Sequence, residues 1–291
     1  MYSQIDSNKR KTIILIAVFV IFIMLLGWIF GQMYNFGYYG LAIAIAISIS
    51  MSLFSYYKGD KIALWTAGAK PIKKQENPYV YNMVENLAIT AGIPTPKIHI
   101  IQDQAMNAFA CGRDPKHASV AMTTGIIEKL ENEELEGVIA HELSHIKNYD
   151  IRIMTIVIIL VGVIALMADW MIRGQLFGFG GRDRNKNGIF IAIGIVLAIL
   201  SPLIAKLIQL AISRKREFLA DADGALLTRY PEGLAKALEK ISKENIPLKR
   251  ANNATSHLYI SNPFKGSKNK MSKMFSTHPP IQERINALKS M

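Results

Sequence analysis

Four apolar stretches dominate the pattern of hydrophobic and polar residues along the chain. The first two, residues 12–30 and 36–56, carry no charged side chain and are separated by a short loop, residues 31–35. Each is about as long as an α-helix must be to cross the hydrocarbon core of a bilayer. Basic residues precede the first stretch and follow the second, whereas the loop has none. Since basic flanks stay on the cytoplasmic side, we predict a transmembrane hairpin with both ends in the cytoplasm.

The second pair of apolar stretches, residues 153–168 and 189–212, is less regular. Asp169 ends the first of them, and Pro202 and Lys206 interrupt the second. The loop between them, RGQLFGFGGRDRNKNG, is basic and would lie outside if both stretches crossed, against the tendency of basic loops to stay inside. Either that tendency is overruled or this hairpin enters the membrane only in part, and we expect it to cross.

The remaining segments have the shorter patterns of a soluble α/β unit. Residues 77–92 have the apolar spacing of an amphipathic helix that ends at a Gly-Ile-Pro sequence. Residues 97–102 and 118–124 are predicted strands, with a strand or extended edge between them at residues 107–112.

Helices are predicted again further along the chain. Asn132 has the side chain of an N-cap, and three of the next four residues are glutamates, which suit the first turn of a helix. Further helices are predicted at residues 214–228, 231–245 and 279–290, the last two opened by proline. Residues 248–276 are polar and are predicted to form a loop.

These patterns predict an α+β, mostly helical membrane protein with two helical transmembrane hairpins. The predicted parts are an N-terminal transmembrane hairpin, a cytosolic α/β part, a second transmembrane hairpin and a cytosolic C-terminal helical part, at residues 1–57, 58–150, 151–212 and 213–291. A hydrophobic share of 51% against 19% charged residues supports a membrane protein over a soluble one.

Charge and cysteine content narrow the class further. The net charge of +12 gathers beside apolar runs, at residues 9–11, Lys58 and residues 214–216, as expected next to a cytoplasmic membrane surface. The sequence has no basic patch interleaved with aromatic residues, so we expect a lipid bilayer and no nucleic acid as partner. Cys111 is the single cysteine, which excludes an intrachain disulfide and fits a reducing compartment.

The candidate chemistry lies in the sequence His-Glu-Leu-Ser-His at residues 141–145. Residues i and i+4 lie on nearly the same face of a helix, so His141 and His145 can bind one metal ion. Glu142 lies about 100° round the helix, close enough to act on a water molecule without being a ligand. Catalytic zinc has three protein ligands and keeps one position for water, whose pKa it lowers. The pattern therefore predicts a hydrolytic metal site that needs a third ligand.

Two acidic residues are candidates for this third ligand. If the helix continued through the third apolar stretch, Asp169 would lie roughly 36 Å from the two histidines, too far to bind the same ion. Glu217 is favoured because the midpoint of the second hairpin, near Gly181, is equidistant in sequence from His145 and Glu217. Asp221, four residues later, can then hold a ligand imidazole by its second N–H. The alternative is that Glu217 and Asp221 are solvated charges that balance the basic residues before them.

Four ordered motifs resemble those of a known family: MNAFACG, HELSH, EFLAD and THPPIQERI, at residues 106–112, 141–145, 217–221 and 277–285. With the N-terminal hairpin they resemble, over essentially the whole chain, the HtpX family of bacterial membrane zinc endopeptidases, which are related to the CAAX prenyl proteases. The resemblance implies a gluzincin-type cytosolic metalloprotease domain with one Zn²⁺ per chain. It matches His141, His145 and Glu217 to the zinc ligands and Glu142 to the catalytic base.

The first of these motifs is a candidate for substrate binding. An exposed strand edge can hold an extended peptide through backbone hydrogen bonds. From the residues alone, an ordinary buried strand is an equal alternative, and the resemblance favours substrate binding by Asn107, Ala108, Phe109 and Ala110. Cys111 stands where the family pattern has threonine, and we interpret it as a small packed residue.

Two further residues, His278 and Arg284, have two possible roles. His278 and Arg284 could donate a hydrogen bond to the oxyanion that develops during peptide hydrolysis, and the resemblance points to the same region. Alternatively, His278 caps the last helix and Arg284 pairs with Asp221. Asp150, like Asn148, can brace the end of the HELSH helix, but nothing in the sequence marks it as catalytic.

The predicted function is that of a membrane-bound, zinc-dependent endopeptidase that hydrolyses misfolded or damaged membrane proteins. The predicted location is the bacterial plasma (inner) membrane, with several membrane passes and a cytoplasmic active site. Two alternatives stay open: a CAAX-type processing protease with a defined C-terminal site, and a non-enzymatic membrane scaffold with a structural metal. The sequence gives no oligomeric state.

Overall fold

The computed structural model describes residues 2–33, 37–158, 162, 214–251, 255–264 and 279–291. Most of the predicted second hairpin lies outside the described residues, as do His278 and parts of the predicted loop 248–276.

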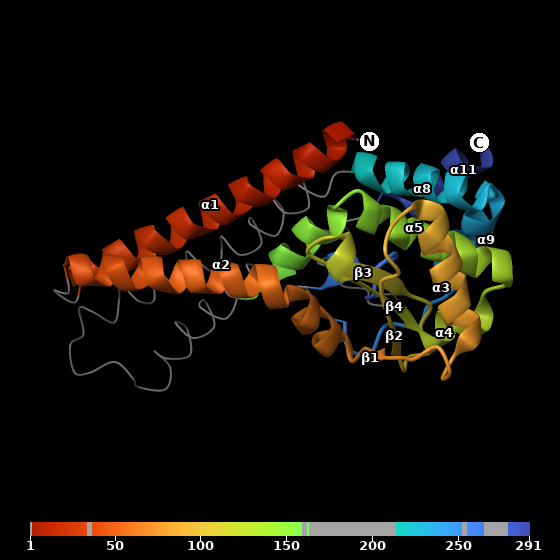
Figure 1. The fold of residues 1–291 in the computed structure, drawn as a ribbon, viewed down its shortest axis with the longest axis horizontal. Coiled ribbons are helices and arrows are strands. Elements are labelled where there is room, and N and C mark those ends of the chain that lie inside the picture. The colour runs from red at the N-terminus through yellow and green to blue at the C-terminus, as the bar shows by residue number, and fades with distance from the viewer. Residues whose placement is uncertain (1, 34–36, 159–161, 163–213, 252–254, 265–278) are drawn as a thin grey trace.

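Two long helices at the N-terminal end lie side by side and project from the rest of the molecule (Figure 1). They are α1 (Tyr2–Met33) and α2 (Tyr38–Ala67). Helices were predicted here at residues 12–30 and 36–56, but α1 already begins at Tyr2 and α2 continues to Ala67. Large apolar side chains are exposed along them; Ile13, Val18 and Ile47, for example, are 67%, 60% and 48% exposed. Among the described residues, α2 is the one helix that length and composition would allow to cross a membrane. Such an apolar exposed surface is unusual for a soluble helix pair.

A four-stranded sheet forms the centre of the remaining part, in the order β1-β2-β4-β3. Its strands are β1 (Lys70–Pro71), β2 (Lys97–Ile101), β3 (Ala108–Gly112) and β4 (Ala118–Thr123). β2 and β4 are parallel, whereas β1 and β3 are antiparallel to their neighbours. The three predicted strands are confirmed, and β3 is an edge strand. β1 was not predicted because two residues carry no alternating pattern.

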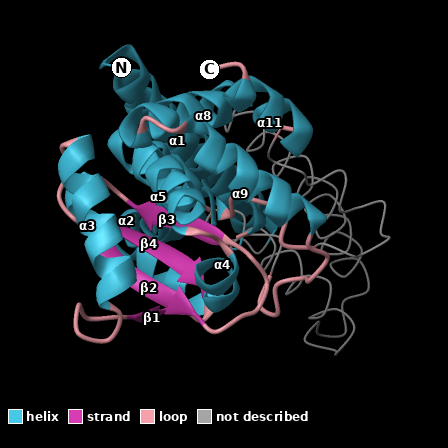
Figure 2. Ribbon diagram, turned by 90° about the vertical axis from the view of Figure 1, so that its right-hand side faces the viewer, coloured by secondary structure: helices cyan, strands magenta, loops and turns pink. Residues whose placement is uncertain are grey.

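Alternate residues of β3 enter two different hydrophobic cores, as the period of a strand requires. Ala108 and Ala110 belong to the core that includes α3 (Pro78–Ala91) on one face of the sheet (Figure 2). Phe109 and Cys111 belong to the core that includes the end of α2 and the helical residues that follow Asp150. Cys111 is fully buried, as expected for a packed residue.

Local sequence determines where several helices begin and end. α3 begins after Asn77, whose side chain accepts a hydrogen bond from the Val80 N–H, and ends at Gly92 with φ 70°. The prediction that Asn132 is an N-cap is wrong. α5 (Asn132–Lys147) is capped by Glu131, because the Glu134 carboxylate reaches back to the Glu131 N–H at 2.9 Å. The other described helices are α4 (Thr124–Lys129), α8 (Arg214–Thr228), α9 (Pro231–Lys243), α11 (Ile281–Lys289) and the 3₁₀ turns η1 (Pro115–His117) and η2 (Ser256–Leu258).

Glycines allow α8 and α9 to approach α5 at close range. A Cβ atom added at Gly137 of α5 would lie 2.7 Å from the backbone N of Leu234 in α9. One added at Gly224 of α8 would lie 3.1 Å from the backbone N of His141. The backbone of α8 therefore lies directly against the HELSH turn of α5, which determines how near the side chains of α8 come to the two histidines.

Candidate metal centre

The two histidines of α5 point toward each other inside the protein. Their Nε2 atoms are 3.2 Å apart and their rings are nearly perpendicular, at 88°. Both side chains are buried, His141 at 1% and His145 at 4% exposure. The i, i+4 spacing on a regular helix therefore brings both imidazoles together, as predicted.

Glu217 of α8 completes a three-residue cluster with them. Its carboxylate oxygens lie 3.5 Å from His145 Nε2 and 3.9 Å from His141 Nε2. One potential ligand atom from each of the three residues lies within 4.8 Å of the others. Ligand atoms about 2.0–2.2 Å from a tetrahedral metal ion are about 3.3–3.6 Å apart. The observed separations lie close to this range, so the cluster fits a single metal ion.

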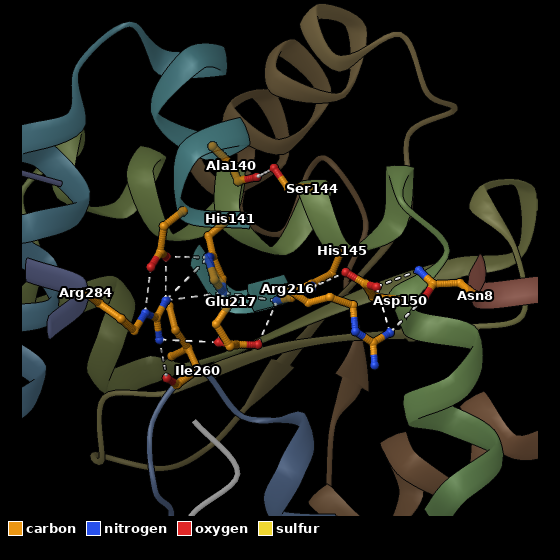
Figure 3. A network of polar contacts seen from close by, with 11 residues as sticks. Asn8, Ala140, His141, Ser144, His145, Asp150, Arg216, Glu217, Ile260 and Arg284 are labelled. Atoms are coloured by element: carbon orange, nitrogen blue, oxygen red, sulfur yellow. Dashed lines mark hydrogen bonds and ion pairs between the residues drawn. The ribbon is translucent and has the colours of Figure 1, made fainter. Parts of the chain in front are cut away.

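Each imidazole is held by a carboxylate at its other nitrogen (Figure 3). His141 Nδ1 lies 2.9 Å from Asp221 Oδ1, and His145 Nδ1 lies 3.0 Å from Asp150 Oδ2. A carboxylate at Nδ1 favours the tautomer that carries its proton there, which leaves Nε2 free to bind a metal. Asp221 was expected in this position, whereas Asp150 was considered only as a brace for the helix end. α5 ends at Lys147 with Asn148 as its C-cap, and the positive φ of Tyr149, 60°, then turns the chain so that Asp150 reaches His145.

Arg284 of α11 lies in the same buried group. Its Nε and Nη2 donate to the two oxygens of Asp221 at 2.8 and 2.7 Å, and its Nη1 lies 3.5 Å from Glu217 Oε2. Nη1 also donates to the backbone oxygen of Ile260 at 3.3 Å. The structure thus contains the Arg284–Asp221 pair, which was the alternative to an oxyanion donor. His278 lies outside the described residues, so its role stays a prediction.

Burial changes the acid–base properties of these groups. It raises the pKa of the Glu142 carboxyl to about 7, where a carboxyl can both take and return a proton near neutral pH. Burial also opposes the ionised form of Asp221, but the positive charge of Arg284 outweighs it and lowers the Asp221 pKa to about 2. Asp221 is therefore a permanent carboxylate partner for His141, while Glu142 is poised to exchange protons.

The edge of β3 lies beside this group, but hydrogen bonds within the protein already occupy part of it. The N–H of Ile260 donates to the oxygen of Ala108 at 3.0 Å, and the Asn107 side chain bonds the backbone of Ser261 at 3.1 Å. Further along, the Gly112 N–H donates to Thr155 Oγ1 at 3.0 Å. Ala110 lies between these two occupied positions, and its backbone hydrogen-bonds Glu142.

A helix with the HELSH sequence, packed on the edge strand of a small sheet and completed by a glutamate from a later helix, defines the site of a metallopeptidase. Comparison with known proteins agrees. The model of peptidase family M48 matches residues 74–291, so the chain belongs to this family. A protease HtpX homologue of Dictyoglomus thermophilum is 47% identical over 290 residues, which cover 100% of this chain and 94% of the relative. A protease HtpX homologue of Listeria monocytogenes is 41% identical over 304 residues and is matched along 100% of both chains.

A solved structure gives an independent comparison of the fold. The crystal structure of S. mikatae Ste24p matches with a TM-score of 0.50 and 19% identity, over 99% of this chain and 67% of the other. At this identity the likeness concerns the fold alone. Family and relatives together make the chain a membrane-bound metalloprotease, a hydrolase that uses a metal ion. The exposed apolar helices α1 and α2 agree with the membrane-bound character.

Proposed function

We propose that the chain is a zinc-dependent endopeptidase that cleaves misfolded or damaged membrane proteins at the cytoplasmic surface of a bacterial plasma membrane. The observation that carries this proposal is the convergence of His141, His145 and Glu217 beside the buried carboxyl of Glu142. Two imidazoles and one carboxylate are the ligand set of catalytic rather than structural zinc sites, which are closed by four protein ligands. We assign Zn²⁺, one per chain, on this chemistry.

Each residue of the site has a proposed task. His141, His145 and Glu217 would hold the ion, whose contribution when bound would be Lewis acidity and a water with a lowered pKa. Glu142 takes the proton from the attacking water and returns it to the leaving amine, a role for which a pKa of about 7 is suited. Asp221 and Asp150 hold the two imidazoles in the orientation that binds metal. Arg284 keeps Asp221 ionised. The Nη1 atom of Arg284 faces Glu217.

Substrate is proposed to bind along the middle of the β3 edge, where the backbone of Ala110 hydrogen-bonds the Glu142 side chain. The free hydrogen-bonding positions of an edge strand alternate, and residues 108, 110 and 112 share one side. Ala108 and Gly112 are bonded to other parts of the protein, whereas Ala110 bonds Glu142 of the site itself. Ala110 is therefore the position at which an extended peptide would pair, in exchange for this bond to Glu142. Asn107, Ala108 and Phe109 would then shape the edge rather than pair with the peptide. Pairing through backbone atoms suits an enzyme that accepts many unfolded sequences.

The membrane helices determine the proposed substrates and orientation. α1 joins the site at its N-terminal end, which carries the basic residues 9–11, and these favour the cytoplasmic side. A site at the cytoplasmic end of membrane helices receives segments that leave the bilayer, which favours quality control of membrane proteins. A CAAX-type processing protease remains the second candidate on the strength of the fold shared with Ste24p.

The test is cleavage of an unfolded soluble protein, such as casein, by the full chain purified in detergent, stripped of metal and then supplied with zinc. We expect zinc to restore cleavage in the wild type. Glu142→Gln should bind zinc and cleave at least about 100-fold more slowly, because it lacks the proton acceptor. Lys289→Ala, at an exposed surface pair, serves as the matched control.

The outcomes separate the candidates. Broad cleavage of casein supports the endopeptidase, whereas cleavage confined to a prenylated C-terminal peptide supports the processing protease. Zinc binding without cleavage in either the wild type or Glu142→Gln would contradict both and leave the scaffold.

A further inference from the structure

A buried polar residue connects the N-terminal membrane helix to the metal centre. Asn8 of α1 is 2% exposed, although α1 otherwise presents many apolar side chains to the outside. Its Nδ2 donates to the backbone oxygen of Asn148 at 2.8 Å. It also donates to Asp150 Oδ1, again at 2.8 Å (Figure 3). These partners are 140 and 142 residues away in sequence and lie just beyond the HELSH turn.

The carboxylate that Asn8 reaches is the one that holds His145. Asp150 Oδ1 accepts from Asn8 Nδ2 and from Arg216 Nη1, the latter at 2.9 Å, while Asp150 Oδ2 faces His145 Nδ1 at 3.0 Å. Arg216 Nη1 also donates to Asn8 Oδ1 at 3.1 Å. One oxygen of Asp150 is therefore fixed by two donors, which determines the direction of the other oxygen toward His145.

Asn8 uses both ends of its amide in this arrangement. The amide nitrogen donates to two acceptors, and the amide oxygen accepts from Arg216. Arg216 immediately precedes Glu217 on α8, so the same contact joins α1 to the helix that provides the third ligand. Neither a hydroxyl nor a carboxylate at position 8 could donate twice and accept once in this geometry.

We propose that Asn8 is a positioning residue of the metal centre, through which the N-terminal membrane helix orients Asp150 and thereby His145 for metal binding. The inference rests on the proposed function only in taking His145 as a metal ligand. Asp150 and Asn8 form successive layers around that ligand, and loss of such outer hydrogen-bonding partners typically lowers metal affinity about 10- to 100-fold.

The alternative role for Asn8 is simple attachment of α1 to the rest of the protein. Attachment would affect stability without changing the geometry of the metal ligands. The two roles therefore predict different results: only the positioning role changes the metal-binding constant and the spectrum of a bound ion when Asn8 is replaced.

The experiment uses the full chain in detergent or nanodiscs. Zinc affinity is measured by competition with a chromophoric chelator, and ligand geometry by the visible absorption of Co²⁺ bound in place of zinc. Asn8→Ala removes the amide, and Asn8→Asp keeps its size and its acceptor but not its donor. Ile13→Ala, on the same helix at a 67% exposed position, is the control.

We expect both Asn8 variants to bind zinc about 10- to 100-fold more weakly and to alter the Co²⁺ spectrum, while Ile13→Ala does neither. In an Asp150→Ala background, Asn8→Ala should add no further loss, because its effect passes through Asp150. Circular dichroism of each variant checks that it is folded, and if Asn8→Ala does not fold, Asn8→Asp provides the comparison.

A folded Asn8 variant with wild-type zinc affinity and Co²⁺ spectrum would overturn the proposal, and so would losses that simply add in the double variant. His145→Ala separates this from a failure of the metal assignment. If His145→Ala binds zinc as tightly as the wild type, the assigned ligand is wrong, whatever the behaviour of Asn8.

Discussion

Arg284 and Asp221 form a two-pronged ion pair between α11 and α8, with N–O distances of 2.8 and 2.7 Å and each side chain only 1% exposed. The same Asp221 carboxylate holds His141 Nδ1 at 2.9 Å. Through a single carboxylate, α11 is thus joined to His141, which we propose as a metal ligand, so changes to the pair should affect both folding and metal binding.

Arg284→Met should lower the free energy of unfolding by about 3–5 kcal/mol, because it leaves Asp221 buried without its charge partner. Adding Asp221→Leu should recover part of this loss, since two apolar side chains replace both charges. Zinc affinity should fall in Arg284→Met, where Asp221 is no longer held by the arginine, and should not recover in the double variant, where His141 lacks its carboxylate. Thermal unfolding and chelator competition on the same samples check the two effects. Recovery of both quantities in the double variant would show that Asp221 does not orient His141.

Metal removal should lower stability in a way that depends on the three proposed ligands. With free zinc at about 1,000 times its dissociation constant, the wild type should gain about 4 kcal/mol over the metal-free chain. Glu217→Ala should lose this gain, because its carboxylate is one of the three converging ligands. Unfolding temperatures with zinc and with a chelator provide the measurement, and Glu239→Ala, at an exposed pair with Lys289, is the control. A zinc-dependent shift that persists in Glu217→Ala would remove Glu217 from the ligand set.

Gly137→Ala should destabilise the protein by about 1–3 kcal/mol, because the added methyl group meets the backbone of α9 at 2.7 Å and the helices must separate. Gly224→Ala should be milder in stability, as its nearest contact is 3.1 Å. That contact is with the backbone of His141, so Gly224→Ala should weaken zinc binding more than Gly137→Ala does. Equal effects of the two variants on zinc affinity would argue against this role for the α5–α8 spacing.

Tyr259 should make the protein sensitive to alkali. It is 1% exposed and packs edge-to-face on Phe109 at 5.2 Å, and burial raises the pKa of its hydroxyl from 10.0 to about 12. The folded state then keeps its proton while the unfolded state loses it. Stability from this group is therefore complete below pH 10 and falls by about 1.4 kcal/mol per pH unit between pH 10 and 12. Tyr259→Phe should flatten this fall in unfolding temperature. Tyr79→Phe should flatten it less, because Tyr79 is 48% exposed and burial raises the pKa of its hydroxyl by a smaller amount.

The sequence predicted those parts of the structure that depend on local spacing. His141 and His145 share one face because helical periodicity requires it, and the strands from Lys97 and Ala118 follow from their β-rich composition. Glu217 could be predicted by an argument about chain length alone, because a helical hairpin returns to its starting level. The domain boundaries stay predictions.

The unpredicted features are those that depend on long-range contacts. Asp150 could have been favoured by its position five residues after His145, but only the left-handed turn at Tyr149 shows that it points back. Nothing local marks Asn8, because its partners lie in distant parts of the chain. The hydrogen bond from Ile260 to the β3 edge could not be predicted either, because residues 248–276 lack any strand-like pattern.

The residues of the buried group around His141 and His145 are synthesised in a fixed order. Its members come from α1, α5, α8 and α11, so ribosomal synthesis delivers Asn8 first and Arg284 last. A growing chain that has already exposed the HELSH helix still lacks the arginine that holds Asp221 beside His141. The complete arrangement therefore forms only after α11 has been synthesised, long after α1 and α2. A hydrolase assembled in this order has its complete site only after its exposed apolar helices have been made.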